Sequence, residues 1–211
     1  MEEGEMGTWA KYDAEREALC TDLAGLEASQ WDTQSLCTEW KVRHVVAHLV
    51  AEGNMKPGAA LIGVMKNGMN SNRYVARVAL AAGQAPPDSL LSQLRATVGA
   101  RTTPLHSKPV VMLEDTVIHA ADIRRPLGVS RTLLEDTLVE VAEYVKTAGY
   151  PLGTRKRIAG LRLVATDVAW STGDGPAVEG PAESLILAMT GRRAGLGDLT
   201  GEGVAVLSSR M

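Results

Sequence analysis

The sequence predicts a mainly α-helical protein that ends in a small α+β part. Up to about residue 150, apolar side chains recur roughly every 3.6 residues within successive segments, as they do in amphipathic helices. After Pro151 the spacing changes to the alternation typical of strands, interrupted by the turn sequence Gly173-Asp174-Gly175-Pro176. We therefore expect a helical bundle over residues 1–150 and a small α+β domain over residues 151–211.

The expected helices of the bundle are amphipathic stretches separated by polar or proline-containing segments. Thr8 is a candidate N-cap for the first helix, and the polar residues 29–39 connect it to the second. Pro57-Gly58 is expected to kink or break the second helix, because proline lacks the N–H that a helix interior requires. The expected ranges are 8–28, 42 to the region 55–69, 72–82, 87–102, 111–124 and 130–148.

The C-terminal part is expected to combine short strands with one helix. Its first strand is predicted within residues 157–167, where Ile158, Leu161 and Leu163 are among the apolar members, and residues 169–171 continue it. The later segments are a short returning strand at 177–179, an amphipathic helix at 181–190 and an apolar run at 203–208.

Composition excludes several classes of protein. The chain has 211 residues, 45% of them apolar, and no Phe, so its core must be aliphatic. A net charge of −3 argues against a general nucleic-acid binder, and no apolar run reaches the roughly 18 residues of a membrane span. The acidic residues 1–5 do not resemble a signal peptide. We expect a cytoplasmic protein without nucleic-acid or membrane partners.

The two cysteines, Cys20 and Cys37, are too few for a disulfide scaffold. Both lie near helical patterns, which favours buried thiols that pack as small apolar side chains. A nucleophilic or redox-active Cys37 is the alternative.

Three polar side chains lie on the apolar face of the helix expected over residues 111–124. Asp115 and His119 are four residues apart, and Asp122 falls within about 60° of them on a helical wheel. Burying an unpaired carboxylate is costly, so something positive must accompany Asp115. A divalent cation held by Asp115 and His119 would do so, with Asp122 orienting a ligand. The alternative is a core histidine that is bonded to an aspartate without metal.

His48 can supply a third ligand, because it also stands among apolar residues of a predicted helix. Two imidazoles and one carboxylate form a catalytic type of metal site that leaves a coordination position open. His44 is four residues from His48 and could pair with it, but we expect His44 nearer the rim, at the start of the helix.

Several stretches, in this order along the chain, resemble the mycothiol-dependent maleylpyruvate isomerase family, which belongs to the DinB-like metal-binding bundles. The resemblance implies a DinB-like four-helix bundle, followed by a short unit of sheet and helix. It also implies a divalent metal, usually zinc, on His48, Asp115 and His119, although nickel and manganese tolerate such ligands too. The stretches are 31–49, 115–119, 122–128, 165–171, 180–181 and 187–192.

The resemblance further implies that a low-molecular-weight thiol, mycothiol, is the cofactor and that Arg192 is a functional arginine. Arginines suit the carboxylates of a substrate or of the thiol. The candidates are Arg73, Arg77, Arg124, Arg125 and Arg192. Each could instead be a solvated surface charge, and Arg124-Arg125 could pair with the last carbonyls of their helix.

This chain departs from the family pattern at three positions. Asp115 stands where the founding isomerases have Glu, and Glu114 points about 100° away and is a poor substitute. Lys41 and His44 replace the Thr and Asp that would act as a capping box. The helix is then expected to start at Thr38 or to be less ordered at its entrance.

Such a site suits thiol chemistry, because coordination to a divalent metal deprotonates a thiol. The resulting sulfur nucleophile could add to an electrophilic double bond or displace a leaving group. We therefore expect a metal- and mycothiol-dependent S-transferase or maleylpyruvate-isomerase-like enzyme that acts on a small electrophile, as a monomer or homodimer. A metal-dependent hydrolase and a non-catalytic binding or regulatory member are the alternatives.

Overall fold

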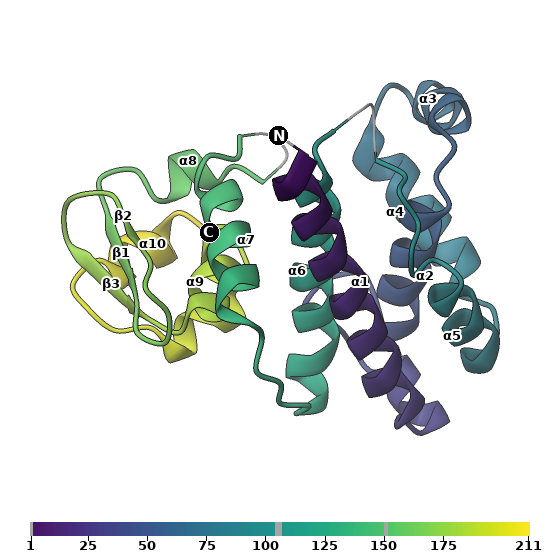
Figure 1. Cartoon of the computed structure of the whole chain (residues 1–211), viewed down its shortest axis with the longest axis horizontal. Helices are drawn as coiled ribbons and strands as arrows, with labels where there is room; N and C mark the ends of the chain where they lie inside the picture. Colours follow the sequence, from purple (N-terminus) through teal and green to yellow (C-terminus); the bar gives the residue numbers. More distant parts are fainter. Residues whose placement is uncertain (1, 104–106, 150–151) are drawn as a thin grey trace. The chain divides into compact units, whose positions relative to one another are not determined.

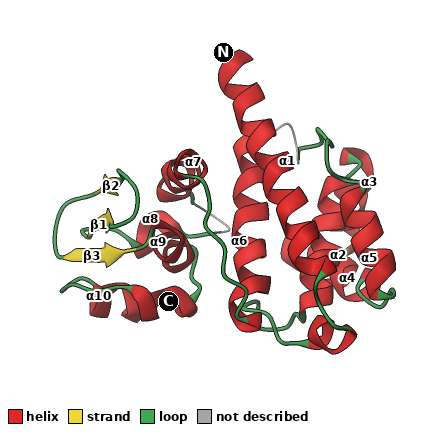
Figure 2. Ribbon diagram, turned by 60° about the horizontal axis from the view of Figure 1, so that its bottom comes forward, coloured by secondary structure: helices red, strands yellow, loops and turns green. Residues whose placement is uncertain are grey.

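The computed structural model of the chain describes residues 2–103, 107–149 and 152–211. It contains two compact units, Met1–Ser130 and Arg131–Met211. Helices make up most of the structure and a small sheet lies in the second unit, so the predicted fold class is confirmed (Figures 1 and 2). The domain boundary expected at residue 150 lies further along the chain than this division. Among the described residues, no helix has the length and apolar character needed to cross a membrane.

The first unit is a bundle in which α1, α2, α5 and α6 pack on one another and α4 packs against α2. A one-turn 3₁₀ helix, η1, follows α1 and places Trp31 against the bundle. The elements are α1 (Glu2–Ala24), η1 (Ala28–Asp32), α2 (Val42–Gly53), α3 (Pro57–Lys66), α4 (Ser71–Ala82), α5 (Pro87–Arg95) and α6 (Pro109–Leu127).

Some of these helices begin or end at other residues than the sequence predicted, and others agree with it. Helix α1 begins at Glu2, so Thr8 lies inside it and is buried rather than capping. Helix α2 ends at Gly53 and α3 begins at Pro57, as expected for a break there. Helix α6 continues past Pro126 and ends at Leu127; its C-cap is Gly128, whose positive φ of 67° is easy for glycine. Proline fits so near the end because it removes only one bond from the last turn.

Helix α2 begins in an ordered, capped turn, whereas the sequence predicted a start at Thr38 or a less ordered entrance. Lys41 is the N-cap and the helix begins at Val42 rather than Thr38. The backbone N–H of Lys41 donates to His44 Nδ1 at 3.2 Å, so an imidazole takes the place of the acidic side chain of a capping box.

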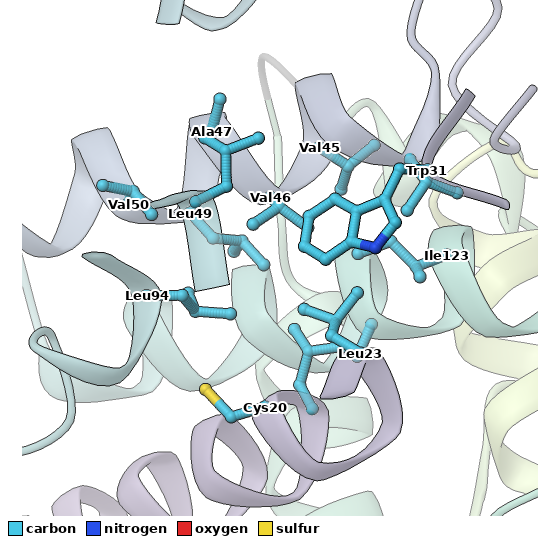
Figure 3. Packing of buried hydrophobic residues seen from close by; sticks show 14 residues of the cluster. Cys20, Leu23, Trp31, Val45, Val46, Ala47, Leu49, Val50, Leu94 and Ile123 are labelled. Carbon is cyan, nitrogen blue, oxygen red and sulfur yellow. The ribbon is translucent and has the colours of Figure 1, made fainter. Parts of the chain in front are cut away.

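The core of the first unit is aliphatic, as the absence of Phe predicts, with Trp31 as its buried aromatic member (Figure 3). Side chains from α1, α2, α5 and α6 meet there, which gives the bundle its main hydrophobic stabilisation. Members with at most 2% exposure include Leu19, Leu23, Val45, Val46, Leu49, Leu94 and Ile123.

The second unit packs helices against a three-stranded sheet of order β2-β1-β3. Strand β1 pairs antiparallel with β2 and parallel with β3, where Leu163 lies opposite Val178. Helix α9 packs on β1, β3 and α7. The elements are α7 (Glu135–Lys146), α8 (Thr154–Arg157), β1 (Arg162–Ala165), β2 (Ser171–Thr172), β3 (Ala177–Gly180), α9 (Ala182–Met189), η3 (Arg193–Asp198) and α10 (Val204–Ser209).

The first strand is shorter than predicted, and Arg157, expected to open it, instead ends α8. The segment between β2 and β3 turns closely against the chain before β1. At Gly175, φ is 128° and an added Cβ would lie 2.3 Å from the carbonyl oxygen of Gly160. Only glycine fits that approach without a shift of backbone.

A charged contact joins α1 to the segment after α5. Both oxygens of Asp13 accept hydrogen bonds from Arg101, at 2.9 Å from Nη1 and 2.6 Å from Nη2, and Oδ1 also accepts from the backbone N–H of Gly99 at 2.9 Å. Burial alone would raise the pKa of Asp13, but these hydrogen bonds outweigh it and lower the pKa.

We predict that Asp13→Asn lowers the free energy of unfolding at pH 7 by about 1 kcal/mol or less, because solvent screens a partly exposed pair. The folded-state pKa of Asp13 is depressed, so its stabilisation is present above the unfolded-state pKa of about 3.9 and is lost as the pH falls through the folded-state value. Urea unfolding of both proteins should show the difference narrowing below about pH 4. A difference that stays constant with pH would contradict this account, and the exposed Glu17→Gln serves as the charge control.

Candidate metal centre

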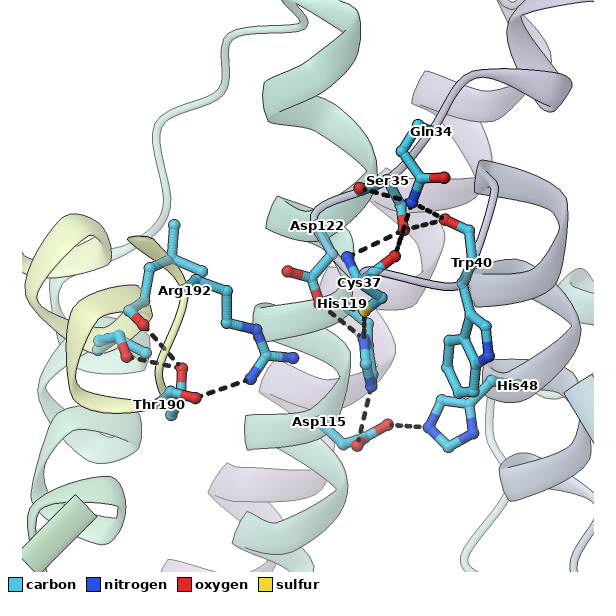
Figure 4. A network of polar contacts seen from close by, with 12 residues as sticks. Gln34, Ser35, Cys37, Trp40, His48, Asp115, His119, Asp122, Thr190 and Arg192 are labelled. Atoms are coloured by element: carbon cyan, nitrogen blue, oxygen red, sulfur yellow. Dashed lines mark hydrogen bonds and ion pairs between the residues drawn. The ribbon is translucent and has the colours of Figure 1, made fainter. Parts of the chain in front are cut away.

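Three of the predicted site residues come together inside the first unit. His48 projects from α2, and Asp115 and His119 project from adjacent turns of α6 (Figure 4). His48 Nε2 lies 3.2 Å from Asp115 Oδ2, and His119 Nε2 lies 3.5 Å from Asp115 Oδ1. The two imidazole rings are 4.8 Å apart between centroids. The carboxylate therefore lies between two imidazole nitrogens that both face it.

The spacing of these atoms suits one divalent ion. Ligands bound tetrahedrally at about 2.0–2.2 Å from an ion are roughly 3.3–3.6 Å from one another. The two distances to Asp115 are close to this range, and the three ligand atoms all lie within 4.8 Å of one another. Two nitrogens and one oxygen are also the donors that zinc accepts, and three protein ligands leave one position open.

The negative charge of Asp115 is balanced by the two histidines that face it. Burial opposes ionisation of Asp115, but the charges of His119 and His48 and a hydrogen bond from His48 outweigh it and hold the pKa of Asp115 well below its usual value. Burial likewise disfavours a charged His119, but Asp115 and Asp122 raise its pKa well above the usual value. The arrangement thus demands a positive charge beside Asp115, which a proton or a metal ion can supply.

The other nitrogen of His119 contacts a second acidic group. His119 Nδ1 lies 2.9 Å from Oδ2 of Asp122, whose side chain is completely buried. A carboxylate on Nδ1 keeps the proton there and leaves Nε2 as the lone-pair donor that a metal needs. This is the position in which Asp122 could orient the ligand, as the sequence predicts.

Cys37 reaches the same carboxylate, which sequence reasoning did not foresee. Its thiol donates to Asp122 Oδ2 at 3.1 Å and lies 3.8 Å from His119 Nδ1. Cys37, His119 and Asp122 form a second group whose ligand atoms lie close together, but it shares His119 with the first group. Cys37 Sγ and His119 Nδ1 both lie at hydrogen-bond distance from Asp122 Oδ2, and both are closer to it than to each other. We therefore interpret Cys37 as a second hydrogen-bond donor to Asp122, beside His119.

A loop before α2 carries Cys37 and Trp40 onto α6. The backbone N–H of Leu36 donates to the carbonyl oxygen of Asp122 at 3.1 Å. That oxygen lacks the usual helical donor, because the residue four positions later is Pro126, which has no N–H. Within the loop, the Gln34 amide donates to the carbonyl oxygens of Cys37 and Trp40 at 2.7 and 2.9 Å.

The indole of Trp40 lies beside two of the candidate metal ligands, His48 and His119. Its ring centroid is 5.3 Å from that of His48 and 6.1 Å from that of His119 (Figure 4). An apolar ring there limits the access of water to both imidazoles and lowers the local dielectric constant, which strengthens the interactions between charges. Trp40 was visible in the sequence as part of a motif, but nothing in its spacing indicated this contact.

A cavity of about 240 Å³ opens beside His48. Its wall combines small aliphatic residues with polar ones, and Glu52 and Lys56 are among the lining residues. The lining residues are His48, Ala51, Glu52, Asn54, Met55, Lys56, Ala60, Tyr74, Val75 and Val78, from α2, α3, α4 and the segment between α2 and α3. The set of ligands therefore has an adjoining space that could hold a small reactant.

His44 lies apart from this centre. Its Nδ1 caps α2, and its ring packs against Gly83, where an added Cβ would be 2.4 Å from His44 Cδ2. Burial, followed by the charges of Arg43 and Lys41, lowers the pKa of His44. The structure thus assigns His44 a place at the entrance of the helix, as expected, and outside both groups of possible metal ligands.

The predicted arginines are placed less directly. Arg124 and Arg125 lie in the last turn of α6, where Arg124 is buried, and neither lines the cavity beside His48. Arg192 belongs to the second unit, where it is the N-cap of η3 and its Nη1 donates to the carbonyl oxygen of Thr190 at 3.4 Å. The roles proposed for these arginines in catalysis and thiol binding stay predictions.

We predict that Asp122→Asn weakens zinc binding by about 10- to 100-fold, the usual effect of removing a carboxylate from a metal-bound histidine. The amide is a poorer acceptor for the Nδ1 proton, so His119 is less firmly oriented. Competition with a chromophoric chelator measures the affinity, and the exposed Asp32→Asn is the control. Equal zinc affinity in Asp122→Asn and the parent protein would show that Asp122 does not orient a ligand.

Comparison with known proteins supports the resemblance seen in the motifs. Residues 12–110 match the family described as mycothiol maleylpyruvate isomerase N-terminal domain. No curated protein matches the chain. The fold is similar to a crystal structure of the mycothiol-dependent maleylpyruvate isomerase, with a TM-score of 0.64 and 16% identity over 94% of this chain and 92% of that one. A structure of a histidine-to-alanine mutant of that isomerase matches with a TM-score of 0.63 and 14% identity, over the same shares of the chains.

Proposed function

We propose that this chain, whose residues 12–110 match the mycothiol maleylpyruvate isomerase N-terminal domain, is a metal- and thiol-dependent enzyme. Its activity would be an S-transfer, or an isomerisation like that of maleylpyruvate isomerase, with mycothiol or a similar low-molecular-weight thiol as cofactor. The observation that carries this proposal is the convergence of His48, Asp115 and His119 beside a cavity. Two distant parts of the chain supply these residues, and the domain match independently suggests a thiol.

The residues of the centre fit a divalent ion, with zinc the first candidate and nickel or manganese also compatible. His48 Nε2, His119 Nε2 and the Asp115 carboxylate would hold the ion. When bound, the ion supplies one property, a lowered pKa for a thiol that occupies its open position. Asp122 retains the proton on His119 Nδ1, and Trp40 restricts water at both imidazoles. No side chain of the protein need act as the nucleophile.

The cavity beside His48 would hold the electrophile. Its volume of about 240 Å³ is below the roughly 300–1,000 Å³ of pockets that enclose drug-sized ligands, so it suits one small reactant. In an isomerisation, the sulfur forms a bond to one carbon of a double bond, rotation follows, and that C–S bond breaks to restore the thiolate. In a transfer, the C–S bond forms as the bond to a leaving group breaks.

We predict that the purified protein binds one zinc ion per chain and that His119→Ala loses it. His48→Ala should behave in the same way, because each substitution removes one of three ligands. His44→Ala is the matched control, since His44 lies on the same helix as His48 but caps its start. Elemental analysis after dialysis provides the measurement. Unchanged zinc in His119→Ala would remove the assignment of the site.

The role of the thiol is tested separately. We predict that the zinc-loaded protein consumes an electrophile only when mycothiol is added, and that the rate falls to background in His48→Ala. Thiol loss and product formation are followed together, because isomerisation restores the thiol whereas transfer consumes it. Turnover of esters or amides without thiol would instead indicate a hydrolase, in which the same ligands serve a water nucleophile. Metal binding without turnover of any kind would indicate a non-catalytic protein.

A further inference from the structure

The two charged side chains at the cavity beside His48 differ in whether they already have a partner. Among the described residues that line the cavity, Glu52 is the acidic one and Lys56 the basic one. The guanidinium of Arg16, a residue with 0% exposure, donates to Glu52 Oε2 at 3.2 Å, so the Glu52 carboxylate already has a cation. No ion pair of Lys56 is found among the described residues. Its ammonium is therefore available to a reactant.

Lys56 does not owe its place to the stability of the helix that it precedes. It is the N-cap of α3, but its side chain is exposed and makes no capping hydrogen bond. A positive charge at the N-terminus of a helix also opposes the helix dipole, which favours anions there. Ala60, in the first turn of α3, lines the same cavity. The ammonium and the positive end of α3 thus both favour an anion at this edge of the cavity.

The chain around Lys56 has the same sign of charge. Residues 53–87, which supply most of the cavity lining, contain four basic residues and no aspartate or glutamate. The other three basic residues, Lys66, Arg73 and Arg77, are exposed and do not line the cavity. A local excess of one charge raises the concentration of small ions of the opposite charge near it. We therefore expect anions, rather than cations, to collect at this part of the surface.

The remaining wall suits an apolar body and offers no partner to a second anion. Its aliphatic members come from α2, from α4 and from the segment between α2 and α3, and none of the chain's arginines is among the described lining residues. A carboxylate that enters such a place without a partner pays the cost of its lost hydration. The cavity, at about 240 Å³, also limits the size of the reactant. The aliphatic lining residues are Ala51, Met55, Ala60, Val75 and Val78.

We propose that Lys56 is the specificity-determining residue of this cavity, and that the electrophile is a small apolar molecule with a single carboxylate, which pairs with the Lys56 ammonium. The inference rests on the proposed function in taking the cavity as the place of the electrophile. It adds the chemical class of that electrophile and the side chain that selects it. Binding of the carboxylate to Lys56 itself requires neither the metal nor the thiol.

Turnover is compared for two electrophiles of the same shape, 4-oxopent-2-enoate and its uncharged amide, 4-oxopent-2-enamide. The ratio of kcat/KM for the acid to that for the amide is measured with zinc and mycothiol present. Its change between variants cancels the intrinsic reactivity of the two compounds. We expect Lys56→Gln to lower this ratio about 10-fold, the low end for a charged hydrogen bond, because solvent screens an exposed ammonium. Lys56→Arg keeps the charge and should keep the ratio close to that of the parent protein.

Binding is measured separately, because it does not depend on turnover. Ligand-observed NMR with the protein as purified compares three unreactive five-carbon probes, pentanoate, pentanamide and glutarate. We expect pentanoate to bind more tightly than the other two, and Lys56→Gln to weaken pentanoate about 10-fold while leaving pentanamide unchanged. Lys66→Gln is the matched control, since Lys66 is an exposed lysine in the last turn of α3 that does not line the cavity. The melting temperature of Lys56→Gln should be no lower than that of the parent protein.

The other outcomes separate this inference from the proposed function. Pentanoate binding that depends on Lys56, without turnover of any electrophile, would support the carboxylate site and count against the proposed enzyme. Thiol-dependent turnover with an unchanged acid-to-amide ratio in Lys56→Gln would overturn the role of Lys56 and leave the enzyme intact. An equal loss in Lys66→Gln would show a general effect of charge and would also overturn it. Glutarate that binds as tightly as pentanoate would overturn the restriction to one carboxylate.

Discussion

The first unit is organised around one partly buried carboxylate, that of Asp115, which requires positive charge beside it. Asp115 of α6 lies between His48 of α2 and His119 of α6. A carboxylate in a low-dielectric interior is tolerable only with partners of this kind. The packing of α2 against α6 and the chemistry of the candidate centre are therefore linked by the same requirement.

Much of the bundle could be predicted from local sequence because its helices are amphipathic and their breaks coincide with Pro57 and Pro87. Asp115 and His119 were also predictable, since helical spacing alone places both on one face. The contact between Glu52 and Arg16 was not, because it joins residues 36 positions apart through tertiary packing. Likewise, the parallel pairing of β1 with β3 depends on a crossover that alternation of side chains does not encode.

His119 shows how far the candidate site extends beyond its ligands. One ring nitrogen faces Asp115, the other faces Asp122, and Cys37 and Leu36 then hold Asp122 through its side chain and its backbone. The family resemblance suggested the ligands, whereas the contacts that orient them come from a loop whose polar sequence indicated only a connection. Loop residues of this kind are recognisable as functional only once the helix that they contact is known.

Pro126, near the end of α6, leaves a backbone acceptor for the loop before α2, because proline has no backbone N–H. With no N–H at Pro126, the carbonyl of Asp122 is left for Leu36, and the loop that delivers Cys37 and Trp40 attaches there. Any residue other than proline at this position would bring a competing donor from within the helix. Because that loop carries Trp40 over both imidazoles, sequence drift at residue 126 would retune reactivity while the donor set remained unaltered.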